Sequence, residues 1–99
     1  MANSDPRLLL LHERDTVLIA RQALPAGAIV LVEGTEVVLP AGLPLGHKLA
    51  RMDMAPGDAV TKYGAPIGYA TIPIACGEHV HLHNVRSGYT PSVALQALV

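Results

Sequence analysis

The chain has 99 residues, enough for a single domain, and carries a net charge of −1 at neutral pH. Apolar residues make up 51% of it without any Phe or Trp, so its core must be built from Leu, Val, Ile and Ala. The sequence has no cluster of basic residues that would bind a nucleic acid, and the apolar segment 8–11 is too short to span a membrane. Because Cys76 is the lone cysteine, an internal disulfide is excluded, and we expect a cytoplasmic protein.

Short segments rich in Leu, Val or Ile follow one another along the chain and are separated by turns that contain Gly and Pro. Such a pattern is typical of an all-β domain. The predicted strands cover residues 7–12, 17–20, 28–32, 36–39, 43–45, 58–61 and 78–83. We therefore expect an N-terminal tail over 1–6 and one β domain over 7–86. Over 87–99 we expect a tail or a short helix, with Thr90 as its N-cap and Pro91 at its first position.

The turns recur with similar sequences, each ending in a Gly, a residue that adopts positive φ without a steric penalty. Successive turns begin 15, 15 and 20 residues apart. Two readings stay open at this point, a duplicated unit or separate hairpins with similar needs. The four turns are Leu24-Pro25-Ala26-Gly27, Leu39-Pro40-Ala41-Gly42, Met54-Ala55-Pro56-Gly57 and Ile74-Ala75-Cys76-Gly77.

The segment 78–83 carries three alternating histidines. In a strand, His79, His81 and His83 would share one face, while Val80 and Leu82 would point into the core. Neighbouring histidines would then lie about 6.5 Å apart and the outer pair about 13 Å apart. Metal–nitrogen bonds are only about 2 Å long, so a metal would need a further ligand from elsewhere, for which another chain is a candidate. The alternative is that these side chains are solvated or bond to neighbouring loops.

Two further clusters carry polar side chains that could act on a substrate. His47 or Lys48 could serve as a general base, and Lys48 could instead bind a carboxylate. Lys62 could hold an acidic substrate, and Tyr63 could donate a hydrogen bond to it. The structural alternatives are a polar strand edge at the first cluster and packing over the core at the second.

The order of five motifs resembles one family, the altronate/galactarate dehydratases, and within it the small SAF-type domain. Sulfolactate sulfo-lyase is a relative. The similarity covers residues 7 to 85, and the ordered set is more specific than any one motif. One departure is Thr16, where Asn is expected. The motifs are Leu11-His12-x-x-Asp15-x-Val17, Leu24-Pro25-Ala26-Gly27, Gly46-His47-Lys48-Leu49-Ala50, Val60-x-Lys62-Tyr63-Gly64-x-Pro66-Ile67-Gly68 and Gly77-Glu78-His79-Val80-His81-x-His83-Asn84.

The resemblance implies a β-clip fold and a role in the elimination of water, or of sulfite, from a small hydroxy or sulfo acid. It implies a small subunit or accessory domain of a lyase that completes its active site with a large catalytic subunit. A divalent metal (iron, manganese or magnesium) would be shared with that partner. The resemblance assigns His47, Lys48, Lys62 and Tyr63 as catalytic residues, His83 and Asn84 as substrate-binding residues, and His79 and His81 as metal ligands.

Two other hypotheses stay open. The first is a free-standing β-clip module that binds a ligand without catalysis. The second is a homo-oligomer whose metal ligands come from two copies.

Overall fold

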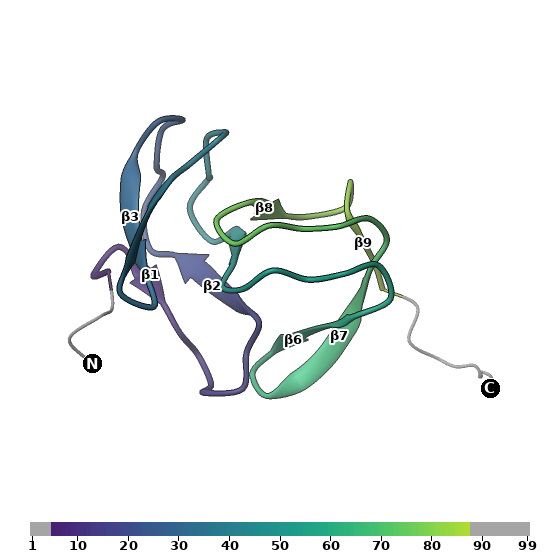
Figure 1. Ribbon diagram of the computed structural model, residues 1–99. Coiled ribbons are helices and arrows are strands. Elements are labelled where there is room, and N and C mark those ends of the chain that lie inside the picture. Colours follow the sequence, from purple (N-terminus) through teal and green to yellow (C-terminus); the bar gives the residue numbers. More distant parts are fainter. Residues whose placement is uncertain (1–4, 88–99) are drawn as a thin grey trace.

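The structure, a computed structural model, describes residues 5–87 and is all-β over that range (Figure 1). All strand pairs are antiparallel. They form a four-stranded sheet in the order β1-β2-β5-β8, the hairpin β3-β4 and a three-stranded sheet in the order β6-β7-β9. The strands are β1 (Leu8–Leu9), β2 (Val17–Ala20), β3 (Ile29–Val32), β4 (Thr35–Val38), β5 (Lys48–Ala50), β6 (Ala59–Lys62), β7 (Ala65–Ala70), β8 (His79–Val80) and β9 (Val85–Arg86).

This architecture confirms the expected all-β domain of the β-clip type. Within residues 5–87 there is no helix that could cross a membrane. The helix expected near the C-terminus lies outside the described residues.

The chain contains two structural repeats related by a shift of about thirty residues. In the first, Gly27 N–H donates to the Leu39 carbonyl, and in the second Gly57 N–H donates to the Ala70 carbonyl. A single antiparallel bridge joins the two turns in each repeat, Leu24 with Leu43 and Met54 with Ile74. The recurring turns therefore belong to a repeated unit of turn, hairpin, turn and strand.

One predicted turn was placed four residues too early. The second turn is Leu43-Pro44-Leu45-Gly46, because Gly46 takes the left-handed conformation, with φ of 82°, and Gly42 does not. Gly46 N–H donates to the Ala20 carbonyl, as Gly77 N–H does to the Ala50 carbonyl in the other repeat. The strand expected over 43–45 is thus replaced by a turn, and β5 begins only at Lys48.

Each repeat has its own apolar core of aliphatic side chains. In the first repeat, Val30, Leu39 and Leu49 pack with their neighbours, and in the second, Val60 and Ile74 do so. Every buried side-chain polar atom of the described residues has a hydrogen-bond partner. The strands β2 and β5 link the repeats, because each contributes side chains to both cores, Leu18 and Leu49 to the first and Val17 and Ala50 to the second.

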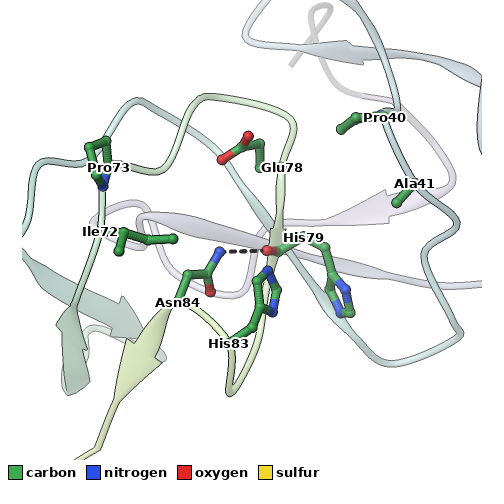
Figure 2. A pocket seen from close by; sticks show the side chains of 8 residues that line it. All are labelled: Pro40, Ala41, Ile72, Pro73, Glu78, His79, His83 and Asn84. Carbon is green, nitrogen blue, oxygen red and sulfur yellow. Dashed lines mark hydrogen bonds between the residues drawn. The ribbon is translucent and has the colours of Figure 1, made fainter.

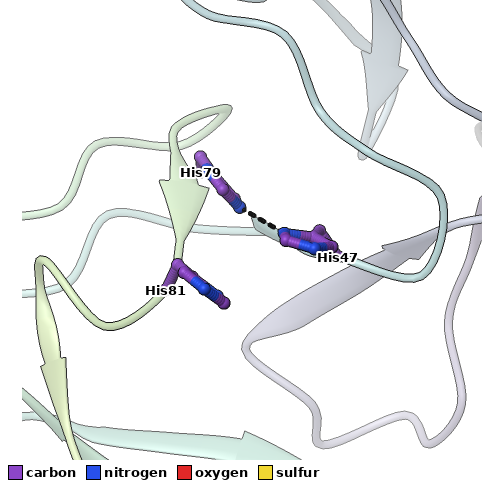
Figure 3. A group of neighbouring side chains, drawn as sticks. All are labelled: His47, His79 and His81. Atoms are coloured by element: carbon purple, nitrogen blue, oxygen red, sulfur yellow. Dashed lines mark hydrogen bonds between the residues drawn. The ribbon is translucent and has the colours of Figure 1, made fainter.

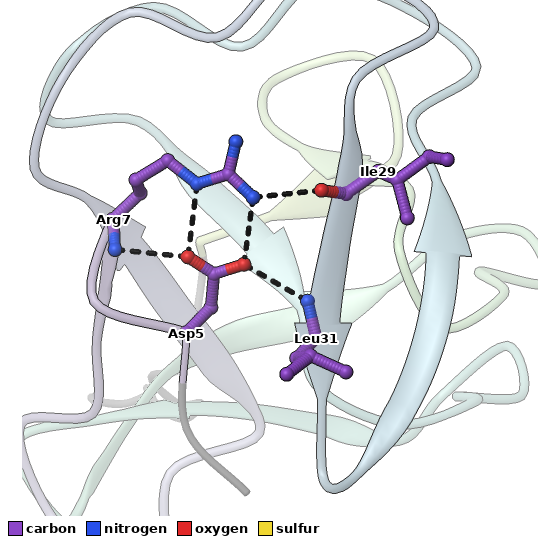
Figure 4. Close-up of polar contacts among 4 residues, drawn as sticks. All are labelled: Asp5, Arg7, Ile29 and Leu31. Atoms are coloured by element: carbon purple, nitrogen blue, oxygen red, sulfur yellow. Dashed lines mark hydrogen bonds and ion pairs between the residues drawn. The ribbon is translucent and has the colours of Figure 1, made fainter.

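An ion pair fastens the N-terminal end of the described chain to β3 (Figure 4). The Asp5 carboxylate accepts hydrogen bonds from the Arg7 guanidinium at 2.9 and 3.0 Å and from the Leu31 N–H at 2.9 Å. Arg7 also donates to the Ile29 carbonyl at 2.7 Å. The Arg7 hydrogen bond is the largest cause that holds the pKa of Asp5 well below its ordinary value, and it outweighs the effect of burial, which acts in the opposite direction.

Candidate metal site

The histidine-rich segment is not a continuous strand. β8 ends at Val80, and the chain turns back over residues 81–84, where the N–H groups of Asn84 and Val85 both donate to the His81 carbonyl at 3.1 Å. The expectation that Leu82 is buried was therefore wrong, because the turn places it at an exposed position, 85% accessible. Val80 is fully buried as expected.

Three imidazoles meet at the junction of β5 and β8 (Figure 3). His47, in the turn before β5, places its Nδ1 atom 2.9 Å from Nε2 of His79. The ring centroids of His79 and His81 are 5.3 Å apart, and those of His47 and His81 are 4.9 Å apart. One nitrogen from each of these three residues, here called the His triad, lies within 4.8 Å of the other two. The further ligand that spacing required is thus present in the same chain.

The pairing of β5 with β8 explains why these residues meet although His47 and His79 are 32 positions apart. Lys48 lies opposite Val80 and Leu49 opposite His79 in this antiparallel pair, so His47 falls level with His81 and diagonal to His79. His81 follows His79 by two residues on the same face, and its ring lies nearly parallel to the His79 ring, at 12°. The turn after β8 changes the position of His83 instead: its ring would lie about 13 Å from His79 on a regular strand, but the two ring centroids are 5.7 Å apart.

His83 lies beside the His triad and lines an adjacent hollow of about 280 Å³ (Figure 2). Its ring centroid is 5.7 Å from that of His79. The hollow combines apolar walls with the polar groups of Glu78, His79, His83 and Asn84. Sequence reasoning did not single out Glu78, although it directly precedes His79. The apolar walls come from Pro40, Ala41, Ile72 and Pro73.

Basic side chains surround His79, a member of the His triad. Burial lowers the pKa of His79, and the neighbouring His47, His81, His83 and Lys48 lower it further. Burial also lowers the pKa of Lys48, with a smaller contribution from the charge of Lys62. Neutral imidazoles are the form that binds metals, and the two ammonium groups favour an anionic ligand nearby.

Lys62 and Tyr63 are neighbours at the β6–β7 hairpin. The charge of Lys62 lowers the pKa of Lys48. Tyr63 is 68% exposed, and no ring contact within residues 5–87 joins it to the His triad. The Lys62 ammonium lies 5.5 Å from the centre of the Tyr63 ring.

A buried carboxylate that sequence reasoning passed over shapes this hairpin. Asp15 is fully buried, and its carboxylate accepts hydrogen bonds from the N–H groups of Tyr63, at 3.0 Å, and Gly64, at 2.7 Å. Both residues have positive φ, 58° and 75°. The His12 ring covers Gly64 so closely that a Cβ there would lie 2.9 Å from it. Two motifs that lie far apart in the sequence are therefore in direct contact.

The sequence profile of the altronate/galactarate dehydratase SAF domain matches residues 6–88 of the chain. The chain belongs to this family. It is 46% identical over 77 residues to altronate dehydratase of Escherichia coli (strain K12), which covers 78% of this chain and 16% of that protein. Altronate dehydratase of Bacillus subtilis (strain 168) is 34% identical over the same shares of both proteins.

A second branch of relatives consists of named subunits of a lyase. The chain is 49% identical over 45 residues to subunit alpha of (2R)-sulfolactate sulfo-lyase from Chromohalobacter salexigens. That match covers 46% of this chain and 48% of the subunit. The family resemblance expected from the motifs is thus confirmed, and the chain spans about 16% of the altronate dehydratases that it matches.

Proposed function

We propose that this chain is the accessory domain or small subunit of a sugar-acid dehydratase, and that its His triad holds a divalent metal at an active site completed by a large catalytic chain. The substrate class is altronate, galactarate or a related hydroxy acid. The observation that carries the proposal is the convergence of His47, His79 and His81 in a domain of this family.

The donor set of the His triad fits a transition metal. Four-coordinate zinc with bonds of about 2.0–2.1 Å places ligand nitrogens about 3.3 Å apart; in this chain His47 Nδ1 and His79 Nε2 share a hydrogen bond of 2.9 Å, and the three donor atoms lie within 4.8 Å of one another. Imidazole suits iron and zinc, whereas magnesium prefers oxygen ligands and retains water. Of iron, manganese and magnesium, we therefore favour iron, because manganese shares the preference of magnesium for oxygen ligands. Such an ion would act as a Lewis acid on the substrate carboxylate.

The ammonium groups beside the His triad would orient the substrate. Lys48 and Lys62 are half-buried, and the charge of Lys62 contributes to the lowered pKa of Lys48, which supports a common role for them. Two cations so placed would hold a carboxylate and stabilise the negative charge that develops when its α-proton leaves. His83, in the hollow, would contact the hydroxylated part of the acid. Tyr63 would act as a hydrogen-bond donor from the hairpin tip.

Exposed apolar side chains border the His triad and fit contact with a large chain. Leu82, between His81 and His83, is 85% exposed, and Leu45, two residues before His47, is 65% exposed. Covering one leucine would contribute about 2 kcal/mol to association. A partner there would also exclude water from the open side of the metal site, which strengthens every charge interaction in it.

Metal titration of the full chain tests the site directly. Co²⁺ is the probe, because its visible absorption reports nitrogen ligation. We expect His47→Ala and His81→Ala to weaken Co²⁺ binding by more than about 100-fold, the upper range for loss of an outer-shell partner. His83→Ala is the matched control and should bind Co²⁺ as the parent chain does. Equal affinities in all four proteins would reject the His triad as a metal site.

Reconstitution tests the functional role. The chain is mixed with the large catalytic part of an altronate dehydratase, and formation of an α-keto acid from altronate or galactarate is measured. We expect activity only from the mixture, with His79→Ala lowering turnover without unfolding the domain. Full activity of the large chain alone would contradict the proposal. A mixture that binds the acids without converting them would instead indicate a binding module.

The second candidate is a small subunit of a sulfo-lyase. It is favoured by the separate subunit alpha of the sulfo-lyase relative, about half of which the chain matches. Release of sulfite from sulfolactate by the same mixture would support this reading over dehydration.

A further inference from the structure

We infer that Asn84 is a positioning residue that fixes His79 and His81 for metal binding, rather than a residue that contacts substrate. The inference rests on the proposed metal site. Asn84 is only 2% exposed, and both ends of its amide bond to the backbone, one of them to His79 as Figure 2 shows. Its Oδ1 accepts from the His81 N–H at 3.0 Å, and its Nδ2 donates to the His79 carbonyl at 2.9 Å.

These two hydrogen bonds lie on the edge of β8 that faces away from β5. The Glu78 carbonyl accepts from Ala50 N–H, so it points toward β5. Because backbone groups alternate sides along a strand, the His79 carbonyl and the His81 N–H point to the opposite edge. There the amide of Asn84 takes the place of a neighbouring strand, since one carbonyl oxygen and one N–H reproduce the hydrogen-bonding groups of a peptide unit.

The Asn84 backbone completes the arrangement. Its N–H donates to the His81 carbonyl at 3.1 Å, and its carbonyl accepts from the Thr71 N–H at 2.9 Å. The residue therefore joins the two ends of the turn to each other and to the end of β7. This fixes the backbone on both sides of Val80, and with it the near-parallel stacking of the His79 and His81 rings at 5.3 Å.

The amide requirement is specific, which gives a sharp substitution. Asn84→Asp keeps the shape and the acceptor for His81 N–H but replaces the donor with an oxygen that faces the His79 carbonyl. Asn84→Ala removes both hydrogen bonds and leaves two polar backbone groups without partners. An aspartate would be tolerated if the residue merely filled space, because the two side chains have nearly the same volume.

The experiment compares both variants with the full chain in two measurements. The first records the ring ¹⁵N and ¹H resonances of His79 and His81 in metal-free protein, and the second measures Co²⁺ affinity. We expect shifted resonances for both histidines in Asn84→Asp and an affinity lowered about 10- to 100-fold, as for loss of a group that orients a ligand. Val60→Ala, in the core of the same repeat, controls for general destabilisation and should leave both readouts unchanged.

The outcomes separate this inference from the proposed function. If the parent chain binds no Co²⁺, the metal site is rejected, while the metal-free resonances still test the role of Asn84. Unchanged His79 and His81 resonances and an unchanged Co²⁺ affinity in Asn84→Asp would overturn the inference. So would an affinity loss of the same size in Val60→Ala. Should Asn84→Ala fail to fold, the isosteric Asp variant carries the test alone.

Discussion

Replacing the buried Asp15 should destabilise the domain more than any comparable change of a surface carboxylate. Its side chain accepts hydrogen bonds from Tyr63 and Gly64, and no cation pairs with the carboxylate within residues 5–87. A hydrogen bond to a charged group contributes about 1.5–3 kcal/mol. Since water can reach the exposed hairpin in the variant, the lower end applies to each bond. We expect Asp15→Ala to lower the free energy of unfolding by about 3 kcal/mol.

Urea denaturation measures this loss through the transition midpoint, provided that the slope is unchanged. The matched control is Asp58→Ala, because the exposed Asp58 accepts a single hydrogen bond, from Ala55 N–H at 2.8 Å. That change should cost about 1 kcal/mol or less. Equal losses for the two variants would refute the reasoning that the buried carboxylate organises the hairpin carrying Lys62 and Tyr63.

Two further predictions concern stability. Gly77→Ala should lower the free energy of unfolding, measured in urea, by more than about 3 kcal/mol, because the strain of a positive φ (94°) adds to a collision with a β4 side chain. Gly57→Ala, where φ is 91° and no atom lies near, should lower it by only about 1–2 kcal/mol. Equal losses in the two variants would contradict the collision. Asp5 has a pKa held below its ordinary value of 3.8, mainly by the Arg7 hydrogen bond, so the unfolded chain takes up its proton first as pH falls. Its stabilising contribution should therefore be complete above about pH 5 and be lost progressively as the pH falls toward the lower pKa of the folded state. Urea midpoints between pH 2 and 7 should show a smaller acid loss in Asp5→Asn, and parallel curves would argue against this linkage.

The metal site shows where reasoning from the sequence stopped. Alternation along a strand correctly buried Val80 and placed His79 and His81 side by side, but it also predicted a buried Leu82 and a His83 about 13 Å from His79, although the ring centroids of these two histidines are only 5.7 Å apart. Both errors have one cause, the turn that begins at His81. The signal for it was present in Asn84, a residue that favours turns, but its effect depends on hydrogen bonds that close the turn around Val80.

The sequence also did not predict the strand β7, for a related reason. The strand β7 contains Pro66 and Gly68, residues that normally mark the end of a strand. It forms nevertheless because the β6–β7 register shifts between Val60 and Thr61, and because Thr61 N–H bonds to the Thr16 hydroxyl instead of to β7. No local sequence pattern predicts that Thr61 N–H bonds to the Thr16 hydroxyl rather than to the neighbouring strand.

The amino-acid sequence by itself determined the all-β class, most of the Gly-bearing turns, the family, and the histidines that could bind a metal. These depend on local backbone preferences and on residue types, which a linear pattern records. Only the tertiary structure decided that His47 joins His79 and His81, that His83 lies in the adjacent hollow, and that Asp15 caps a hairpin far along the chain. Those relations arise from strand pairing between repeats, where residues more than thirty positions apart meet and their spacing along the chain no longer measures distance.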